Sequence, residues 1–392
     1  MGETRLRDAP RTQASVWPVR LVFLMEAVVI GAWLPRIPDI KLALDLGAGE
    51  LGLALTGMPA GSLIGFMVAP RFAAVLGLRR ACMFAGALFA LSFMPLAFAG
   101  SGVLLFAVLA LCGLTVALVE VAMNSKAGEV EAVTGKRVMS QCHGFWSIGA
   151  VVGALLGGAI AQAGISPAMQ FLVLNPVLAA VAFGVAVAMS PDATLTGEST
   201  VGFIVLPPLA LVPLCLLPVG IMGLEGAVID WSAIFVREVL QGEPIAAASA
   251  FAAFSTMMAI MRLTGDALAE RFGARRVVLA AALAAAGGVA LFAVSPNLPV
   301  LLIAATMMGA GCGPVYPLAM SAAAAAPGRS AEANVAAMSF IAFAVFLAGP
   351  PLMGGLTELF DLRTAFAILV PAALASAALS GTLKFHDDRA RR

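Results

Sequence analysis

Apolar residues along the chain gather into twelve long stretches, which short polar breaks separate. The stretches are rich in Ala, Leu, Gly and Val, and they reach the length of about 20 residues that a helix needs to cross the hydrocarbon of a bilayer. They lack the polar–apolar alternation of an outer-membrane barrel strand. The pattern predicts transmembrane helices at 17–35, 51–76, 81–99, 102–123, 138–161, 169–190, 203–235, 245–264, 277–295, 299–322, 335–356 and 364–383.

The composition agrees with this pattern. Hydrophobic residues make up 61% of the 392 residues and charged residues 11%, whereas soluble domains are about half apolar and about a quarter charged. The breaks are too short to hold an extramembrane domain. We therefore expect an all-α polytopic membrane protein. The net charge of +1 gives no indication of nucleic-acid binding.

Lysine and arginine are distributed unevenly between the breaks. With the N-terminus in the cytoplasm, 18 of the 23 fall inside, four fall outside and Arg262 lies within a helix. The positive-inside rule then places both termini in the cytoplasm, and we expect a bacterial inner (plasma) membrane protein. The four outside are Arg36, Lys41, Arg237 and Arg363.

Neither a signal peptide nor a cofactor site is expected. No small-residue cleavage site follows the apolar run at 21–35, so this run is interpreted as the first span. The five cysteines lie in apolar segments without metal or redox spacing. They are interpreted as small buried hydrophobic residues. We expect no metal and no cofactor.

The two halves of the chain repeat each other. The loop sequence Gly77-Leu78-Arg79-Arg80 has a counterpart 196 residues later, in Gly273-Ala274-Arg275-Arg276, and Gly113 has a counterpart in Gly309. This interval is half of the chain length. Parallel six-helix repeats are typical of a large class of secondary transporters that bind their solute between the halves. We expect one six-helix bundle over 1–190, a polar cytoplasmic linker over 191–203 and a second bundle over 204–392.

The loop after the eighth helix resembles the signature that the major facilitator superfamily carries between helices 2 and 3 and repeats between helices 8 and 9. The resemblance covers essentially the whole chain and implies the major facilitator fold, transport by alternating access and a motif that closes the cytoplasmic side. In the first half, Pro70 stands in place of Asp266 and Val75 in place of Arg271, so only the second half carries the motif. Its positions, called here the cytoplasmic gate motif, are Gly265, Asp266, Arg271, Gly273, Arg275 and Arg276.

A narrower resemblance concerns Glu120-Val-Ala-Met-Asn124 and the segment 141–149. These segments look like helices 4 and 5 of the fucose:proton symporter family and its bacterial relatives. In that family, acidic residues on helices 4 and 1 are associated with proton coupling and substrate binding. The resemblance implies these roles for Glu120 and Glu26.

Three ionisable residues lie inside predicted helices at a similar depth, in the cytoplasmic third of the membrane. Glu26, Glu120 and His143 are each six residues from a basic residue at the cytoplasmic end of the helix. A carboxylate in hydrocarbon costs about 2.5–3.5 kcal/mol and by default marks function. These three are our proton-coupling candidates. The alternative is that they bond across helices for packing, with Glu120 and His143 as a static pair.

Five further residues are candidates for substrate binding, with packing as the alternative for each. Some share a helix face with the coupling candidates, one is the second-half counterpart of Glu26, and one lies between two prolines where its helix should bend. They are Trp33, Asn124, Ser147, Glu225 and Tyr316.

Two other patterns concern packing. Asp230-Trp231 is expected at the outer boundary of its helix, because tryptophan prefers the membrane interface. Gly149, Gly153 and Gly157 recur every four residues, so this face is expected to pack closely on a neighbouring helix.

The function we expect is secondary active transport, with proton-coupled uptake of a small polar molecule such as a sugar as the first choice. Proton-driven efflux of a drug or metabolite is the alternative. A membrane enzyme is disfavoured, because the chain has two histidines and no nucleophile–base or metal spacing. A Gly-rich phosphate loop, which a primary pump needs, does not occur. The expected partners are a small-molecule solute, protons and membrane lipid, and the expected state is a monomer.

Overall fold

The computed structural model describes residues 15–136, 138–193 and 206–383, and these are helical throughout apart from short connections. The helices are α1 (Trp17–Trp33), α2 (Ile37–Ala43), α3 (Ala48–Leu55), α4 (Gly57–Leu76), α5 (Leu78–Leu91), α6 (Gly102–Thr134), α7 (Met139–Gln162), α8 (Pro167–Val187), α9 (Val212–Leu216), α10 (Val219–Ile234), α11 (Pro244–Phe272), α12 (Ala274–Val294), α13 (Leu298–Ala324), α14 (Ala331–Leu359), α15 (Leu362–Ala367) and α16 (Leu369–Leu379).

Twelve segments of the described chain are long and apolar enough to cross a membrane. The first runs from Trp17 to Ala43, the seventh from Val212 to Val239 and the twelfth from Leu362 to Leu383. Each corresponds to one predicted helix, so the predicted fold class is confirmed. The sixth and seventh spans are joined through 194–205, which holds most of the predicted linker and lies outside the described residues.

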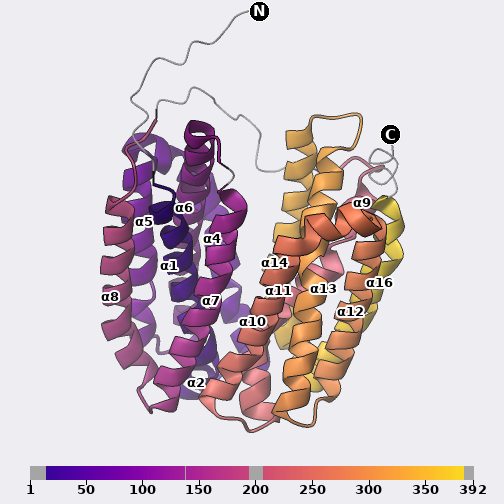
Figure 1. Cartoon of the computed structure of the whole chain (residues 1–392). Helices are drawn as coiled ribbons and strands as arrows, with labels where there is room; N and C mark the ends of the chain where they lie inside the picture. Colours follow the sequence, from indigo (N-terminus) through magenta and orange to yellow (C-terminus); the bar gives the residue numbers. More distant parts are fainter. Residues whose placement is uncertain (1–14, 137, 194–205, 384–392) are drawn as a thin grey trace, which may run out of the picture.

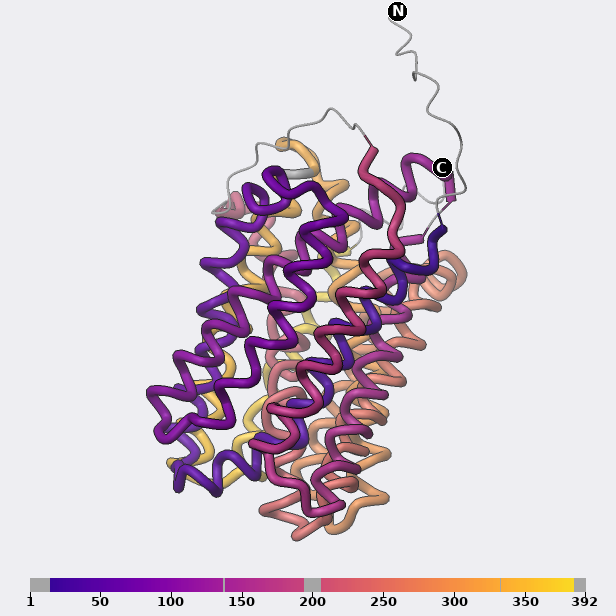
Figure 2. Tube along the Cα trace, turned by 90° about the vertical axis from the view of Figure 1, so that its left-hand side faces the viewer, coloured from indigo at the N-terminus to yellow at the C-terminus, as the bar shows by residue number. Residues whose placement is uncertain are grey.

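The helices form two groups, which Figure 1 shows side by side. We call α1–α8 the first bundle and α9–α16 the second bundle. The side on which α1 begins and α16 ends is called the terminal side, and the opposite side, where α2 lies, is called the distal side. Figure 2, turned by 90°, shows that the spans of both bundles run in roughly the same direction.

A pair of glycines shows the repeat in three dimensions. A Cβ added to Gly113 of α6 would lie 1.8 Å from the carbonyl oxygen of Met58 on α4. A Cβ added to Gly309 of α13 would lie 2.2 Å from the carbonyl oxygen of Phe254 on α11. The two glycines are 196 residues apart, as are their two partners, which is the interval of the sequence repeat. The same backbone contact is therefore built twice, once in each bundle, and neither site accepts a side chain.

The repeated loops also have matching conformations. Gly77 joins α4 to α5 with φ +78°, and Gly273 joins α11 to α12 with φ +88°. Positive φ is readily adopted by glycine and costs other residues energy. The glycine thus lets a long helix end and the next begin after a single residue. The arginines that follow each glycine lie in the first turn of the next helix.

Helix α7 packs on α1 through the predicted glycine face. A Cβ added to Gly149, Gly153 or Gly157 would lie 2.2–2.4 Å from a carbonyl oxygen of α1. The expectation that this face serves packing is confirmed. The close contact fixes α1 against the rest of the first bundle, which positions Glu26 and Trp33 on α1.

Candidate functional site

A cavity of about 1060 Å³ lies between the two bundles. The first bundle lines it with residues of α1, α3, α4 and α6, and the second bundle lines it with residues of α10, α13 and α14. The lining extends to Ala331, the first residue of α14, so the cavity reaches the terminal side. This is the candidate solute site.

The cavity lining follows the internal repeat. One pair of lining residues occupies equivalent positions of α6 and α13, 196 residues apart in the sequence: Glu120 and Tyr316. The duplicated scaffold thus supplies different chemistry at equivalent points: a carboxyl group in the first bundle faces the same cavity as a phenol in the second.

The polar part of the lining is small and acidic. Glu120 and Asp230 contribute carboxyl groups, and Ser62, Tyr316 and Ser339 contribute hydroxyl groups. None of the described lining residues is Lys, Arg or His. The rest of the lining is apolar and rich in aromatic side chains. The cavity therefore combines acidic side chains with aromatic surface.

Asp230 is a site residue that the sequence interpretation misses. We expected Asp230-Trp231 at the outer boundary of its helix, and this expectation is wrong. The span continues to Val239, Trp231 is fully buried and Asp230 lines the cavity. The preference of tryptophan for the interface is misleading here, because Trp231 packs inside the second bundle instead.

Glu26 is buried behind the cavity and is not part of its lining. Its side chain is 4% exposed, and its Oε2 accepts a hydrogen bond from the indole Nε1 of Trp146 on α7. Its other oxygen, Oε1, is buried without a partner among the described residues. Glu26 lies on α1, which contacts α6, the helix that carries Glu120. Trp146 carries no signal in the sequence, because it lies 120 residues from its partner.

His143, Asn124 and Ser147 lie outside the cavity lining. The His143 ring packs edge-on against Phe23, with ring centroids 5.4 Å apart. Asn124 Nδ2 donates to the carbonyl oxygen of Glu120 at 2.9 Å. Ser147 Oγ donates to the carbonyl oxygen of His143 at 3.1 Å. Among the described residues no hydrogen bond or ion pair joins Glu120 to His143, so the static pair is not formed in this conformation.

Of the remaining candidates, Trp33 and Tyr316 line the cavity and Glu225 does not. Glu225 on α10 forms an ion pair with Arg262 on α11, with Oε1 and Nη2 3.0 Å apart. This pair neutralises the one basic residue that the sequence places within a helix. The next residue of α11, Leu263, lies opposite Gly144 of α7 in the first bundle, which locates the pair near the interface of the bundles.

Contacts between the bundles close the distal side. An ion pair joins Lys41 to Glu238 at 2.6 Å, and the backbone N–H of Gly49 donates to Glu358 Oε2 at 3.2 Å. Where α3 crosses α14, a Cβ added to Gly52 would lie 2.5 Å from the carbonyl oxygen of Pro350. The cavity is therefore sealed from the distal side.

Helices α7 and α11 show the same asymmetry along their length. A Cβ added to Gly158, near the distal end of α7, would lie 2.5 Å from the Ala248 side chain. A Cβ added to Gly144, near the terminal end, would lie 3.9 Å from the nearest atom of Leu263. The bundles are in tighter contact on the distal side, so the conformation is open towards the terminal side.

The cytoplasmic gate motif lies on the terminal side of the second bundle. Asp266, Arg271, Arg275 and Arg276 are exposed, and no ion pair involves them among the described residues. Gly265 is buried against Pro314 of α13. Between the described residues the motif thus makes no ion pair that would close the terminal side, which is consistent with the opening of the cavity there.

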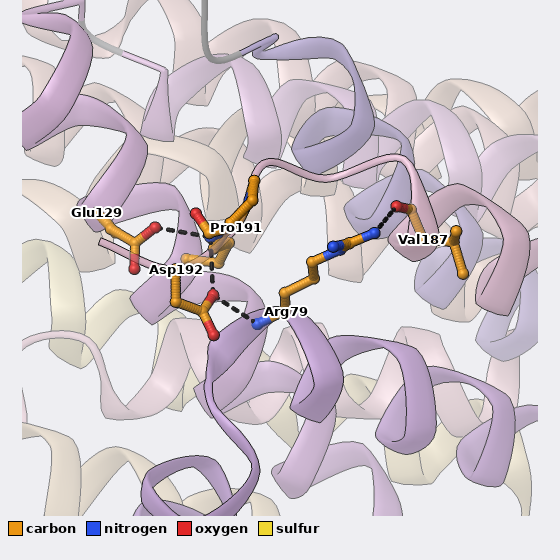
Figure 3. Close-up of polar contacts among 6 residues, drawn as sticks. Arg79, Glu129, Val187, Pro191 and Asp192 are labelled. Atoms are coloured by element: carbon orange, nitrogen blue, oxygen red, sulfur yellow. Dashed lines mark hydrogen bonds and ion pairs between the residues drawn. The ribbon is translucent and has the colours of Figure 1, made fainter. Parts of the chain in front are cut away.

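The first bundle has a polar network at the equivalent place, although its loop lacks the aspartate. Asp192, which follows α8, lies 2.9 Å from Lys126 Nζ and accepts a hydrogen bond at 2.9 Å from the backbone N–H of Arg79. Lys126 is fully buried and also pairs with Glu129 at 2.6 Å. Arg79 donates to the carbonyl oxygen of Val187. Figure 3 shows Asp192 between these groups.

Asp192 thus provides the carboxylate that the first-half loop lacks, since Pro70 stands there in place of Asp266. It lies at the N-terminus of α5, where a negative charge is favourable. The sequence interpretation assigns this residue to the linker that begins at 191 and gives no sign of this role. The first residues after α8 belong structurally to the first bundle.

Comparisons with known proteins agree with the fold. A family model described as Major Facilitator Superfamily matches residues 219–392. An uncharacterised transporter, y4wD, of Sinorhizobium fredii is 32% identical over 365 residues, covering 92% of this chain and 96% of that protein. An uncharacterised MFS-type transporter of Yersinia pestis is 28% identical over 91% of this chain and 94% of its own length. The membrane protein MosC of Rhizobium meliloti is 26% identical over 92% of this chain and 88% of its own length.

Solved structures share the fold at lower identity. The crystal structure of the nucleoside transporter NupG superposes with a TM-score of 0.74 at 12% identity, over 94% of this chain and 99% of that chain. A bacterial homologue of the human lysosomal transporter Spinster, in an inward-facing and occupied conformation, superposes with a TM-score of 0.70 at 16% identity, over 95% of this chain and 96% of that chain.

Proposed function

Because the chain belongs to the major facilitator superfamily and is an integral membrane transporter of a small-molecule solute, we propose that it couples solute movement to protons through Glu120. The observation that carries the proposal is the position of this carboxyl group, which lines the cavity between the bundles. Among the described residues no cation pairs with it. A carboxyl group in the cavity lining is accessible to both the solute and protons.

The buried carboxyl group of Glu26 supports the same proton-coupling role for Glu120. Glu26 lies on α1 beside α6, which carries Glu120; it is buried, and its Oε1 has no partner among the described residues. A carboxylate without a partner inside a membrane is costly. Proton uptake and release by Glu26 and Glu120 therefore change the free energy of the protein in this region. We propose that Trp146 holds Glu26 in place while Glu120 exchanges its proton with the cavity. His143 remains a candidate for relaying that proton to the terminal side.

Two directions of transport are supported to different degrees. Proton-coupled uptake of a small polar molecule, such as a sugar, is the first candidate, because the helix 4 and 5 segments resemble the fucose:proton symporter family. The hydroxyl groups of Tyr316 and Ser339 offer hydrogen bonds to such a molecule. Proton-driven efflux is the second candidate. The largely apolar lining, with Phe340 and Phe346 among its residues, favours it for an amphipathic solute.

We propose that the two halves, 1–190 and 204–392, rotate against each other about the linker 191–203. The terminal side is then cytoplasmic, the protein lies in the bacterial inner membrane, and the conformation described here is inward-open. The outward-open state would form when the distal contacts break and the cytoplasmic gate motif joins the two bundles on the terminal side. We propose that this cycle runs in a monomer, since one chain contains the whole cavity.

The topology has a direct test. Alkaline phosphatase, which is active only outside the cytoplasm, is fused after Gly164 on the distal side or after Gly328 on the terminal side. The proposed orientation predicts activity for the first fusion and none for the second. The reverse result would contradict the assignment of sides.

The coupling is tested with purified protein in proteoliposomes that contain a pH-sensitive dye. Sugars, nucleosides and common efflux substrates are added in turn, and proton movement is recorded. We expect one class of solute to drive proton movement, and Glu120→Gln to abolish it. Glu270→Gln is the matched control, because Glu270 lies near the end of α11, outside the cavity lining. Transport without protons in the wild type, unchanged by Glu120→Gln, would refute the proposal.

A further inference from the structure

The charge of the cavity lining is one-sided. Its two carboxyl side chains, Glu120 and Asp230, come from opposite bundles, and no basic side chain accompanies them among the described lining residues. The neighbouring basic residue Arg262 is already paired with Glu225. A solute that enters this space therefore meets two carboxyl groups that no basic side chain of the described lining pairs with.

Asp230 differs from most carboxylates of the transmembrane helices in having no partner. Neither a hydrogen bond nor an ion pair involves its side chain among the described residues. Most other carboxylates in the spans have one. Five are paired with a side chain: Glu26 with Trp146, Asp39 with Arg36, Glu129 with Lys126, Glu225 with Arg262 and Glu238 with Lys41. Glu50, Glu131 and Glu358 accept hydrogen bonds from backbone N–H groups.

Glu120 also lacks a partner among the described residues, and the proposed function already assigns it to the proton. Asp230 lies on α10 in the second bundle, where no proton-coupling candidate lines the cavity. An unpaired charge inside the membrane is costly. A positively charged group on the solute would remove that cost while it is bound.

An aromatic surface lies beside Asp230. Phe340, Phe343 and Phe346 line the cavity from α14 at three-residue intervals, which places them along one side of that helix. Phe346 packs on α10 one turn before Asp230: a Cβ added to Gly226 would lie 3.6 Å from Phe346 Cδ1. The absence of a side chain at Gly226 lets the ring lie close to α10. Aromatic faces attract cations as well as apolar groups.

We propose that the transported solute is an organic cation, a protonated amine on a ring or chain, whose charged group binds Asp230 while its body contacts the phenylalanines of α14. This inference rests on the proposed function, because it assigns a substrate class to the same cavity. The two carboxyl groups then have different roles, since Asp230 recognises the charge of the solute and Glu120 carries the proton.

The test compares matched pairs of compounds that differ in charge. Glucosamine and glucose form one pair, and phenethylamine and phenylethanol form the other. Binding to the purified full-length protein is measured by the shift of its thermal unfolding midpoint and by isothermal titration. We expect the amine of at least one pair to bind more tightly than its neutral partner. Asp230→Asn should weaken the binding of that amine by about tenfold or more. This is the effect expected when one member of a desolvated charge pair is removed.

Two further variants are controls for loss of folding. Asp230→Glu retains the charge and should retain the preference for the amine, whereas Glu270→Gln should behave like the wild type. In Asp230→Asn, the neutral compound should bind as it does in the wild type. Equal binding of amine and neutral partner by the wild type, no binding by any of the four compounds, or an unchanged preference in Asp230→Asn would overturn the proposal. Proton movement driven by a neutral solute and lost in Glu120→Gln would leave the coupling intact while excluding a cationic solute, so the two proposals fail separately.

Discussion

Lys41 Nζ lies 2.6 Å from Oε1 of Glu238, and this ion pair joins the first bundle to the second on the distal side. Glu238 belongs to a π-helical turn at Phe235–Val239, directly after α10. The pair therefore connects the end of the first span to the end of the seventh, which carries Asp230. The pair is one of the contacts that hold the distal ends of the two bundles together in this conformation.

Reversing the charge at Lys41 should favour distal opening. In Lys41→Glu, two carboxylates face each other, whereas the exchange Lys41→Glu with Glu238→Lys restores the pair. A partly exposed ion pair contributes about 0.2–1 kcal/mol, so loss of the attraction alone should change the population by up to about fivefold. The repulsion between the two carboxylates adds to this change. The measurement is the rate at which an impermeant maleimide labels Leu55→Cys, a lining position near the distal seal.

The native cysteines give little background in this assay, because all five are buried. We expect faster labelling in the single variant and the original rate in the exchange variant. Equal rates in all three proteins would show that the ion pair does not contribute to the distal seal.

A larger effect is expected where α3 crosses α14. Gly52→Leu introduces a side chain where even a Cβ would lie 2.5 Å from the carbonyl oxygen of Pro350. The two helices must separate, and the same maleimide assay should report distal opening. Gly355→Leu is the matched control on α14, because a Cβ at Gly355 meets nothing within 4 Å. If Leu55→Cys were labelled at the same rate in both variants, the crossing of α3 and α14 would not form the distal seal.

Much of the fold could be predicted from the sequence, because the physical signals are local. Twelve apolar stretches of bilayer length predict twelve spans, and glycines at four-residue intervals predict that α7 packs closely on a neighbour. The 196-residue repeat is a property of the sequence itself. It predicts that Gly113 and Gly309 have equivalent surroundings, which the structure shows.

The site could be predicted less well, because its contacts join distant parts of the chain. Nothing near Glu26 indicates that Trp146 is its partner. The polar neighbours of Asp192 suggest a linker, although it completes a network with Lys126 in the first bundle. The tryptophan beside Asp230 suggests a helix boundary, but its burial depends on tertiary packing. The assigned roles of Glu120 and the other candidates remain predictions.

Removing Lys126 should destabilise the first bundle. Lys126 is fully buried and Glu129 is 4% exposed, so Lys126→Met leaves a buried carboxylate without its cation. Breaking a buried ion pair in this way costs about 3–5 kcal/mol. The double variant Lys126→Met with Glu129→Leu removes both charges and should recover much of the lost stability, since Asp192 is partly exposed and can be hydrated.

The measurement is the thermal unfolding midpoint in detergent, followed for both variants. Lys136→Met is the control, because Lys136 is exposed in the connection that follows α6. A double variant that is no more stable than Lys126→Met would indicate that the network acts through Asp192 alone.

The start of the twelfth span should respond to acid through Asp361. This residue precedes α15, and its Oδ1 accepts a hydrogen bond at 2.8 Å from the backbone N–H of Thr364. That bond holds the pKa of Asp361 below its ordinary value of 3.8. A carboxyl group whose pKa is lower in the folded than in the unfolded protein stabilises the fold above the unfolded pKa. This contribution is lost as the pH falls below 3.8 through the folded pKa.

Asp361→Asn keeps an oxygen that can accept the bond from Thr364 but does not titrate. The stability difference between wild type and Asp361→Asn should therefore shrink as the solution is acidified through this range. Comparing the two proteins cancels the titration of the other carboxyl groups. The readout is the thermal unfolding midpoint, together with hydrogen exchange of the α15 amides. A difference that stays constant with pH would mean that the charge of Asp361 makes no contribution to the start of α15.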